Sequence, residues 1–104
     1  MAVDKKTAIQ TGKQFASLVR SKIDNDALIM LFGSCVKNKT HKKSDIDIAV
    51  VSKAFGSNVV DNLVSISLLG YSVHPDIEAH AISIKDWEYA TPFINEIKRT
   101  GVVL

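Results

Sequence analysis

Residues 27–51 hold two apolar segments, Ala27-Leu-Ile-Met-Leu-Phe-Gly33-Ser34 and Asp45-Ile-Asp47-Ile-Ala-Val-Val51, separated by ten residues. The first segment is continuously apolar up to its Gly-Ser pair, as is typical of a strand buried on both faces. The second segment opens with two aspartates two positions apart. Because side chains alternate between the faces of a strand, Asp45 and Asp47 share one face. This stretch predicts two strands with a turn and paired carboxylates at one sheet edge.

The composition is that of a single small domain. The chain has 104 residues, 46% of them hydrophobic, and a formal net charge of +2. A chain of this length buries one core but leaves little chain to enclose a large acceptor. The charge is too balanced to predict nucleic-acid binding, so nucleic acid is not an expected partner. A lysine-rich segment over 37–43 departs from this average, and it is either a solvated loop or a loop that faces phosphate.

The N-terminus and the cysteine content indicate the compartment. Cys35 is the only cysteine, so no intrachain disulfide can form. Asp4, Lys5 and Lys6 are charged and no apolar core of a signal peptide follows them. No apolar run approaches the roughly 20 residues that span a bilayer. We therefore expect a cytoplasmic protein that does not enter a membrane.

Apolar periodicity and turn signals predict an alternating order of helices and strands. The expected elements are a helix over 5–23 after the cap Asp4, a strand over 27–32, a short helix from 34, a strand over 45–51, a helix from 57 to 69, a strand over 77–84, a helix over 93–99 after Thr91-Pro92, and a strand over 102–104. The expected fold class is α/β (α+β), a small mixed β-sheet with helices packed on one side. The chain is expected to form one domain over 1–104.

The helix after the second strand is expected to begin at the cap Ser57 and to stop at Gly70. Its inner face is predicted from apolar residues at helical spacing, namely Val59, Val60, Leu63, Val64 and Ile66. In the following strand, alternation places Glu78 and His80 on one face. We interpret His80 either as a donor to a carboxylate or as a histidine satisfied within its strand.

The Gly33-Ser34 pair is interpreted as a phosphate-binding turn. Glycine tolerates positive φ and lets a phosphate approach the backbone, and the N-terminus of a following helix attracts an anion. Ser34 would donate its hydroxyl to a phosphate oxygen. Asp45 and Asp47 offer hard oxygen ligands, which suit Mg²⁺. Together these residues predict a site for metal and phosphate at one edge of the sheet.

The motif Leu31-Phe32-Gly33-Ser34, ten residues, Asp45-Ile46-Asp47 resembles the signature of minimal nucleotidyltransferases in the DNA polymerase β-like superfamily. Downstream, Ile77-Glu78-Ala79-His80 is similar to the Ile-Glu-Pro-His strand of one subgroup, and residues 92–104 are similar to its usual ending. The resemblance covers residues 27 to 104. It implies a small α/β fold with a mixed sheet, and the transfer of a nucleoside monophosphate from a nucleoside triphosphate to a hydroxyl.

The resemblance also implies roles for individual residues. Asp45 and Asp47 would hold two Mg²⁺ ions, and Glu78 would be the third carboxylate, as a metal ligand or as the base. Asp76 stays open as an alternative third carboxylate, because it lies two positions before Glu78 on the same strand face. The residues implied in binding the triphosphate are Gly33, Ser34, Lys37 and Ser44.

For the partner, the resemblance points to a toxin–antitoxin system. Small members of the family are similar to antitoxins encoded beside all-helical HEPN ribonucleases, which they modify by attaching AMP to a tyrosine. We therefore expect ATP as the donor, protein AMPylation as the activity and a HEPN-type protein as the partner. The alternative is a catalytically inactive domain of the same fold that neutralises its partner by contact. The sequence is compatible with a homo-oligomer and does not reveal the base preference.

Overall fold

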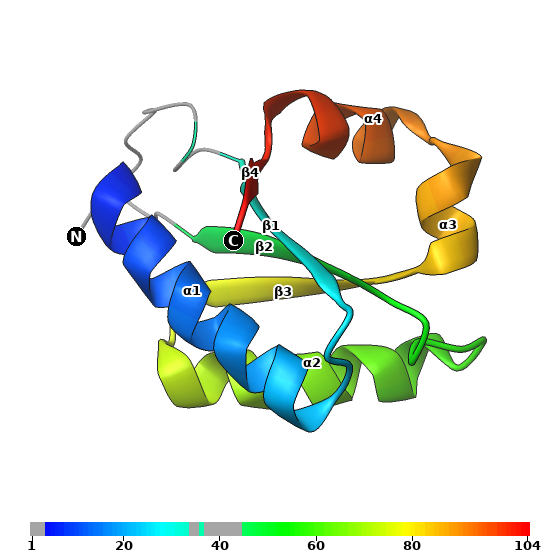
Figure 1. Cartoon of the computed structure of the whole chain (residues 1–104), viewed down its shortest axis with the longest axis horizontal. Helices are drawn as coiled ribbons and strands as arrows, with labels where there is room; N and C mark the ends of the chain where they lie inside the picture. The colour runs from blue at the N-terminus through cyan, green and yellow to red at the C-terminus, as the bar shows by residue number, and fades with distance from the viewer. Residues whose placement is uncertain (1–3, 34–35, 37–44) are drawn as a thin grey trace.

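The computed structural model describes residues 4–33, 36 and 45–104, and its centre is a four-stranded sheet in the order β3-β2-β1-β4 (Figure 1). The strands are β1 (Leu28–Phe32), β2 (Ile46–Ser52), β3 (Ile77–Ser83) and β4 (Val102–Val103). β1 pairs antiparallel with both β2 and β4, whereas β2 and β3 are parallel. The sheet is therefore mixed, as the sequence predicted.

The described residues form the helices α1 (Lys5–Lys22), α2 (Val59–Val73), α3 (Ile84–Tyr89) and α4 (Pro92–Thr100). Two of the predicted caps are confirmed. The Asp4 carboxylate accepts a hydrogen bond from the Thr7 N–H at 2.7 Å, and the Thr91 hydroxyl oxygen accepts one from the Ile94 N–H at 3.2 Å. These bonds satisfy N–H groups that a first helical turn leaves without a partner.

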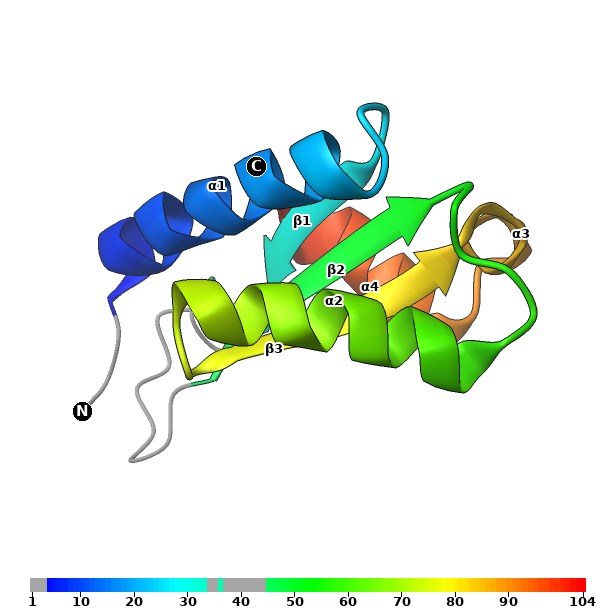
Figure 2. The same ribbon diagram turned by 90° about the horizontal axis from the view of Figure 1, so that it is seen from below.

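Helices cover both faces of the sheet (Figure 2). One face packs against α1 and α2, in a core that includes Phe15, Ile29, Leu31, Ile48 and Ile66. The other face packs against α4, in a core that includes Met30, Phe32, Ala49, Val51 and Ile97. The prediction that the helices pack on one side is thus wrong for α4. The physical reason is that β1 and β2 are apolar on both faces, so each face needs a cover.

Helix α2 differs from its prediction at both ends. Its cap is Asn58 rather than Ser57, and the helix continues through Gly70 to Val73. Gly70 is buried, and a Cβ atom there would lie 2.9 Å from Cγ2 of Ile77 on β3. Glycine is present at this position because the helix approaches the strand closely, and it does not end the helix.

The predicted inner face of α2 is mostly exposed. Ile66 is buried as expected, but the other four members are 48–72% exposed: Val59, Val60, Leu63 and Val64. The residues that pack on the core are Ile66, Leu69, Gly70 and Val73, in the second half of the helix. An apolar surface therefore remains on the outer side of α2.

Other differences are local. Helix α3 was not predicted, and it is a single short segment capped by Ser83 with no buried residue. The helix expected from residue 34 and the lysine-rich segment lie outside the described residues. Within the part of the chain that the structure describes, no helix has both the length and the apolar character needed to cross a membrane.

Candidate functional site

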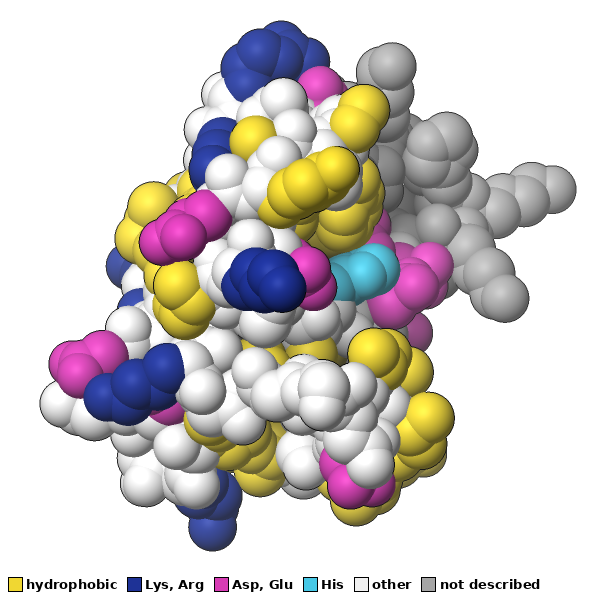
Figure 3. All heavy atoms as spheres, turned by 90° about the vertical axis from the view of Figure 1, so that its right-hand side faces the viewer, with side chains coloured by type: hydrophobic (Ala, Val, Ile, Leu, Met, Phe, Trp, Pro, Cys, Tyr) yellow, Lys and Arg dark blue, Asp and Glu magenta, His cyan; other side chains and the backbone are white. Residues whose placement is uncertain are grey.

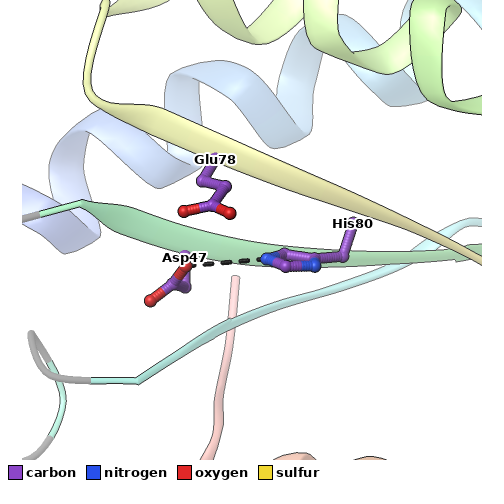
Figure 4. Close-up of side chains that lie close together, drawn as sticks. All are labelled: Asp47, Glu78 and His80. Carbon is purple, nitrogen blue, oxygen red and sulfur yellow. Dashed lines mark ion pairs between the residues drawn. The ribbon is translucent and has the colours of Figure 1, made fainter.

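The candidate site lies where β2 begins, beside its parallel neighbour β3. Asp47 of β2 is in register with Glu78 of β3, and Ala49 is in register with His80. Since residues two apart share a face, Asp47, Glu78 and His80 all project from the side of the sheet that α4 covers. Figure 4 shows these three side chains close together.

The three side chains form a set of metal-ligating atoms. Each offers one ligand atom, and these atoms lie within 4.8 Å of one another. His80 Nε2 lies 3.5 Å from Asp47 Oδ1. This nitrogen is buried and has no hydrogen-bond partner among the described residues, although the side chain as a whole is 30% exposed. Two carboxylates and an imidazole are ligands that divalent cations accept, so the residues present fit such an ion.

Gly33 makes room for this arrangement at the end of β1. Its φ of +83° lies in the left-handed region, which confirms the positive φ expected for the Gly-Ser turn. A side chain at this position would also overlap the Asp47 carboxylate, because a Cβ atom there would collide with Oδ2. Gly33 therefore has a second role that its sequence position did not reveal: it leaves the space in which Asp47 lies.

The structure separates the two aspartates of the motif. Asp45 is exposed and directly precedes β2, whereas Asp47 lies within the strand and is 23% exposed at its side chain. Among the described residues, the group of close ligand atoms contains Asp47 and not Asp45. Its second carboxylate comes from the neighbouring strand. Register across the parallel pair, more than spacing along β2, brings the acids together.

Of the two residues left open as the third carboxylate, Glu78 is the one beside Asp47. The Asp76 carboxylate lies instead 4.0 Å from His74 Nδ1. Asp76 contributes through its backbone, because its carbonyl accepts a hydrogen bond from the Ile46 N–H at 2.8 Å and so ties the start of β2 to the start of β3. The predicted triphosphate ligands Ser34, Lys37 and Ser44 lie outside the described residues, and their roles stay predictions.

Two phenylalanines that sequence reasoning missed hold the imidazole. The His80 ring centroid lies 5.2 Å from that of Phe32 and 5.8 Å from that of Phe93, and the two phenylalanines are 5.6 Å apart. Tilted ring contacts of this kind restrict the orientation of the imidazole. The only signal in the sequence was that Phe32 precedes Gly33 and that Phe93 follows a helix-opening proline.

A hollow of about 260 Å³ adjoins His80 and Phe93. Its lining also includes Val59 and Leu63 from the start of α2 and Ile82 of β3. The hollow thus connects the candidate site with the exposed apolar surface of α2.

The comparison with protein families agrees with this geometry. Residues 13–99 match a family model described as a nucleotidyltransferase domain, and the matched region includes Gly33, Asp47, Glu78 and His80. A search of curated proteins found no significant match. Because the matched region spans most of the sequence, the chain belongs to the nucleotidyltransferase domain family.

Proposed function

We propose that this domain transfers a nucleoside monophosphate from a nucleoside triphosphate, with ATP as the donor, to a hydroxyl group of a partner protein. Membership of the nucleotidyltransferase domain family supports the transfer of nucleotidyl groups. The observation that carries the proposal is the convergence of Asp47 and Glu78 beside Gly33. Metal-ligating oxygens next to a glycine turn are what a triphosphate with a bound cation requires.

The reaction is a displacement at phosphorus. The acceptor oxygen attacks the α-phosphorus, the bond from that phosphorus to the bridging oxygen breaks, and pyrophosphate leaves. When bound, a divalent cation, with Mg²⁺ the expected one, would polarise the α-phosphate and stabilise the leaving pyrophosphate. Asp47 and Glu78 would hold this cation, with Asp45 as a further ligand. Glu78, which is exposed, would also accept the proton of the hydroxyl.

Exposed apolar side chains on α2 support a protein as the acceptor. Val60, Val64, Leu68 and Tyr71 lie three or four positions apart along the helix and are 51–71% exposed. Contiguous exposed apolar surface on a small domain marks a site of interaction. On the face shown in Figure 3, acidic side chains gather beside a histidine, with hydrophobic side chains above and below them. A HEPN-type helical protein that contacts these residues and also reaches Val59 and Leu63, which line the hollow beside His80, would bring its hydroxyl to the site.

Labelled ATP tests the proposal directly. The protein, Mg²⁺ and the product of the adjacent gene are incubated with ATP labelled on its α-phosphate or on its γ-phosphate, and modified residues are located by mass spectrometry. We expect label from the α-phosphate alone, with an AMP adduct on the partner. Asp47→Asn should abolish labelling, whereas Asp76→Asn, an acid outside the ligand group, should retain it. Labelling that survives in Asp47→Asn would contradict the assignment of the site.

The second candidate function is neutralisation of the partner by contact, and the exposed surface of α2 is the observation that favours it. The two functions differ in what the variants do. If contact alone suffices, Leu68→Lys should weaken the complex and Asp47→Asn should leave neutralisation unchanged. If AMP transfer is the function, Asp47→Asn should abolish neutralisation even though the complex still forms. Leu68 is 68% exposed, so its substitution should not disturb the core.

A further inference from the structure

We infer that His80 is itself a metal ligand through Nε2, and that the cation at this site is one that accepts a nitrogen ligand, Mn²⁺ in preference to Mg²⁺. The inference rests on the proposed function, because it names the class of metal for the same site. It differs from the sequence-based interpretation of His80, which was either a donor to a carboxylate or a histidine satisfied within its strand.

The geometry of the parallel strands brings three different ligands to one point. Asp47 and Glu78 are directly opposite in register, and His80 follows Glu78 by two positions on the same face. Ligand atoms about 2.1 Å from one ion lie at most about 4.2 Å apart. The ligand atoms here are within 4.8 Å of one another. Small side-chain rotations would therefore bring all three atoms within bonding distance of one cation.

The state of His80 Nε2 points to a ligand. The nitrogen is buried without a hydrogen-bond partner among the described residues, which is costly for a polar atom. Its distance of 3.5 Å from Asp47 Oδ1 exceeds the usual range of about 2.7–3.2 Å for an N–H···O hydrogen bond. A cation between the nitrogen and the carboxylate would satisfy both atoms. Phe32 and Phe93 hold the ring so that this nitrogen stays directed at the acids.

The donor set then selects the metal. Mg²⁺ prefers oxygen ligands and keeps several waters, whereas imidazole nitrogen is a ligand for transition-metal ions. Mn²⁺ also accepts carboxylate and phosphate oxygens, which the proposed reaction needs. Glu78 lies on the exposed side of the group, where further positions on the ion remain available to phosphate oxygens and water. Two carboxylates and one imidazole therefore favour Mn²⁺ at this position.

Electron paramagnetic resonance of Mn²⁺ tests the inference without any activity measurement. Metal-free full-length protein is titrated with Mn²⁺, alone and with inorganic tripolyphosphate, which contains no nitrogen. We expect pulsed spectra of the bound ion to show hyperfine coupling to a directly bonded nitrogen. The coupling should disappear in His80→Gln, and the preference for Mn²⁺ over Mg²⁺ in competition should fall by about tenfold or more. His74→Gln is the matched control, since His74 is 33% exposed at its side chain and lies beside Asp76.

Each outcome has a separate meaning. Bound Mn²⁺ without nitrogen coupling in the wild-type protein would overturn the inference about His80 and leave the proposed function intact. Failure to bind any divalent cation, even with tripolyphosphate, would overturn both. Loss of coupling in His74→Gln as well as in His80→Gln would also contradict the assignment. The wild-type spectrum decides the matter even if His80→Gln does not fold.

Discussion

The two ends of β2 hold carboxylates in opposite situations. At the C-terminal end, the buried hydroxyl of Ser52 donates a hydrogen bond of 2.7 Å to Asp24, and the Asp26 N–H donates another of 2.9 Å. At the N-terminal end, Asp47 faces the carboxylate of Glu78 and a nitrogen of His80 that lacks a hydrogen-bond partner among the described residues. At one end the carboxylate is satisfied by hydrogen bonds from the protein, and at the other the carboxylates lie among candidate metal ligands.

The difference separates an acid that is satisfied by donors of the protein from one that lies among candidate metal ligands. The hydrogen bond from Ser52, followed by that from Asp26 and by the charge of Lys53, lowers the pKa of Asp24 below its ordinary value of 3.8. Donors in the protein itself thus satisfy this carboxylate, and it stabilises the fold. The acids at the other end are gathered with a further ligand atom, an arrangement that a bound cation would stabilise. The same strand therefore has a satisfied structural carboxylate near one end and the candidate metal site at the other.

Asp47→Asn should have the largest effect. It removes a ligand oxygen, and loss even of groups that merely support a metal ligand typically costs about 10–100-fold, so we expect nucleotidyl transfer to fall by more than about 100-fold. The melting temperature should change little, because the substitution removes repulsion with Glu78 and keeps the side chain's size. Transfer kinetics and thermal melting check this. If Asp47→Asn retains transfer activity near that of the wild type, Asp47 is not needed for the reaction, and the contrast with Asp24 at the other end of β2 does not hold.

Gly33→Ala should damage both the fold and the site. The positive φ costs a residue other than glycine about 1–3 kcal/mol, and the new Cβ displaces the Asp47 carboxylate. The urea concentration at the midpoint of unfolding and the affinity for metal should therefore both fall. Gly56→Ala is the matched control, because no atom of the described residues lies within 4 Å of a Cβ there. Equal behaviour of the two variants would show that Gly33 does not support Asp47.

Ser52→Ala should affect stability alone. Removing the donor leaves the hydrogen-bond network at this end of β2 incomplete, at a cost of about 1–3 kcal/mol in the free energy of unfolding. Transfer activity per folded molecule should not change. Ser65→Ala removes an exposed hydroxyl that donates to the Asp61 carbonyl, and it should shift stability by less than about 0.5 kcal/mol. A loss of transfer activity per folded molecule in Ser52→Ala would contradict this prediction, because it would mean that Ser52 also supports the candidate site at the other end of β2.

The smallest effect concerns pH. Because the pKa of Asp24 is lowered by folding, its stabilising contribution is fully present above about pH 4 and is lost as the pH falls through the folded value. The stability gap between the wild type and Ser52→Ala should therefore narrow as the pH falls from 6 towards about 3. Urea midpoints across this range measure the gap. A gap independent of pH would mean that the Asp24 charge does not contribute.

Several features of the site follow from short-range patterns in the sequence. Apolar runs next to turn residues predicted both central strands, and the Gly-Ser turn predicted the positive φ of Gly33. Alternation in the strand over 77–84 also placed Glu78 and His80 on one face, as the structure has them. These predictions succeeded because the period of a strand and the steric freedom of glycine are properties of the local chain.

Tertiary structure alone decided which of those residues meet. The parallel register of β2 and β3 brings Glu78 and His80 to Asp47, and Gly33 and the two phenylalanines complete their surroundings. Packing also decided that α2 buries its second half and exposes Val60 and Val64, against the predicted face. Register and helix orientation depend on contacts between residues far apart in the chain, which periodicity within one segment does not encode.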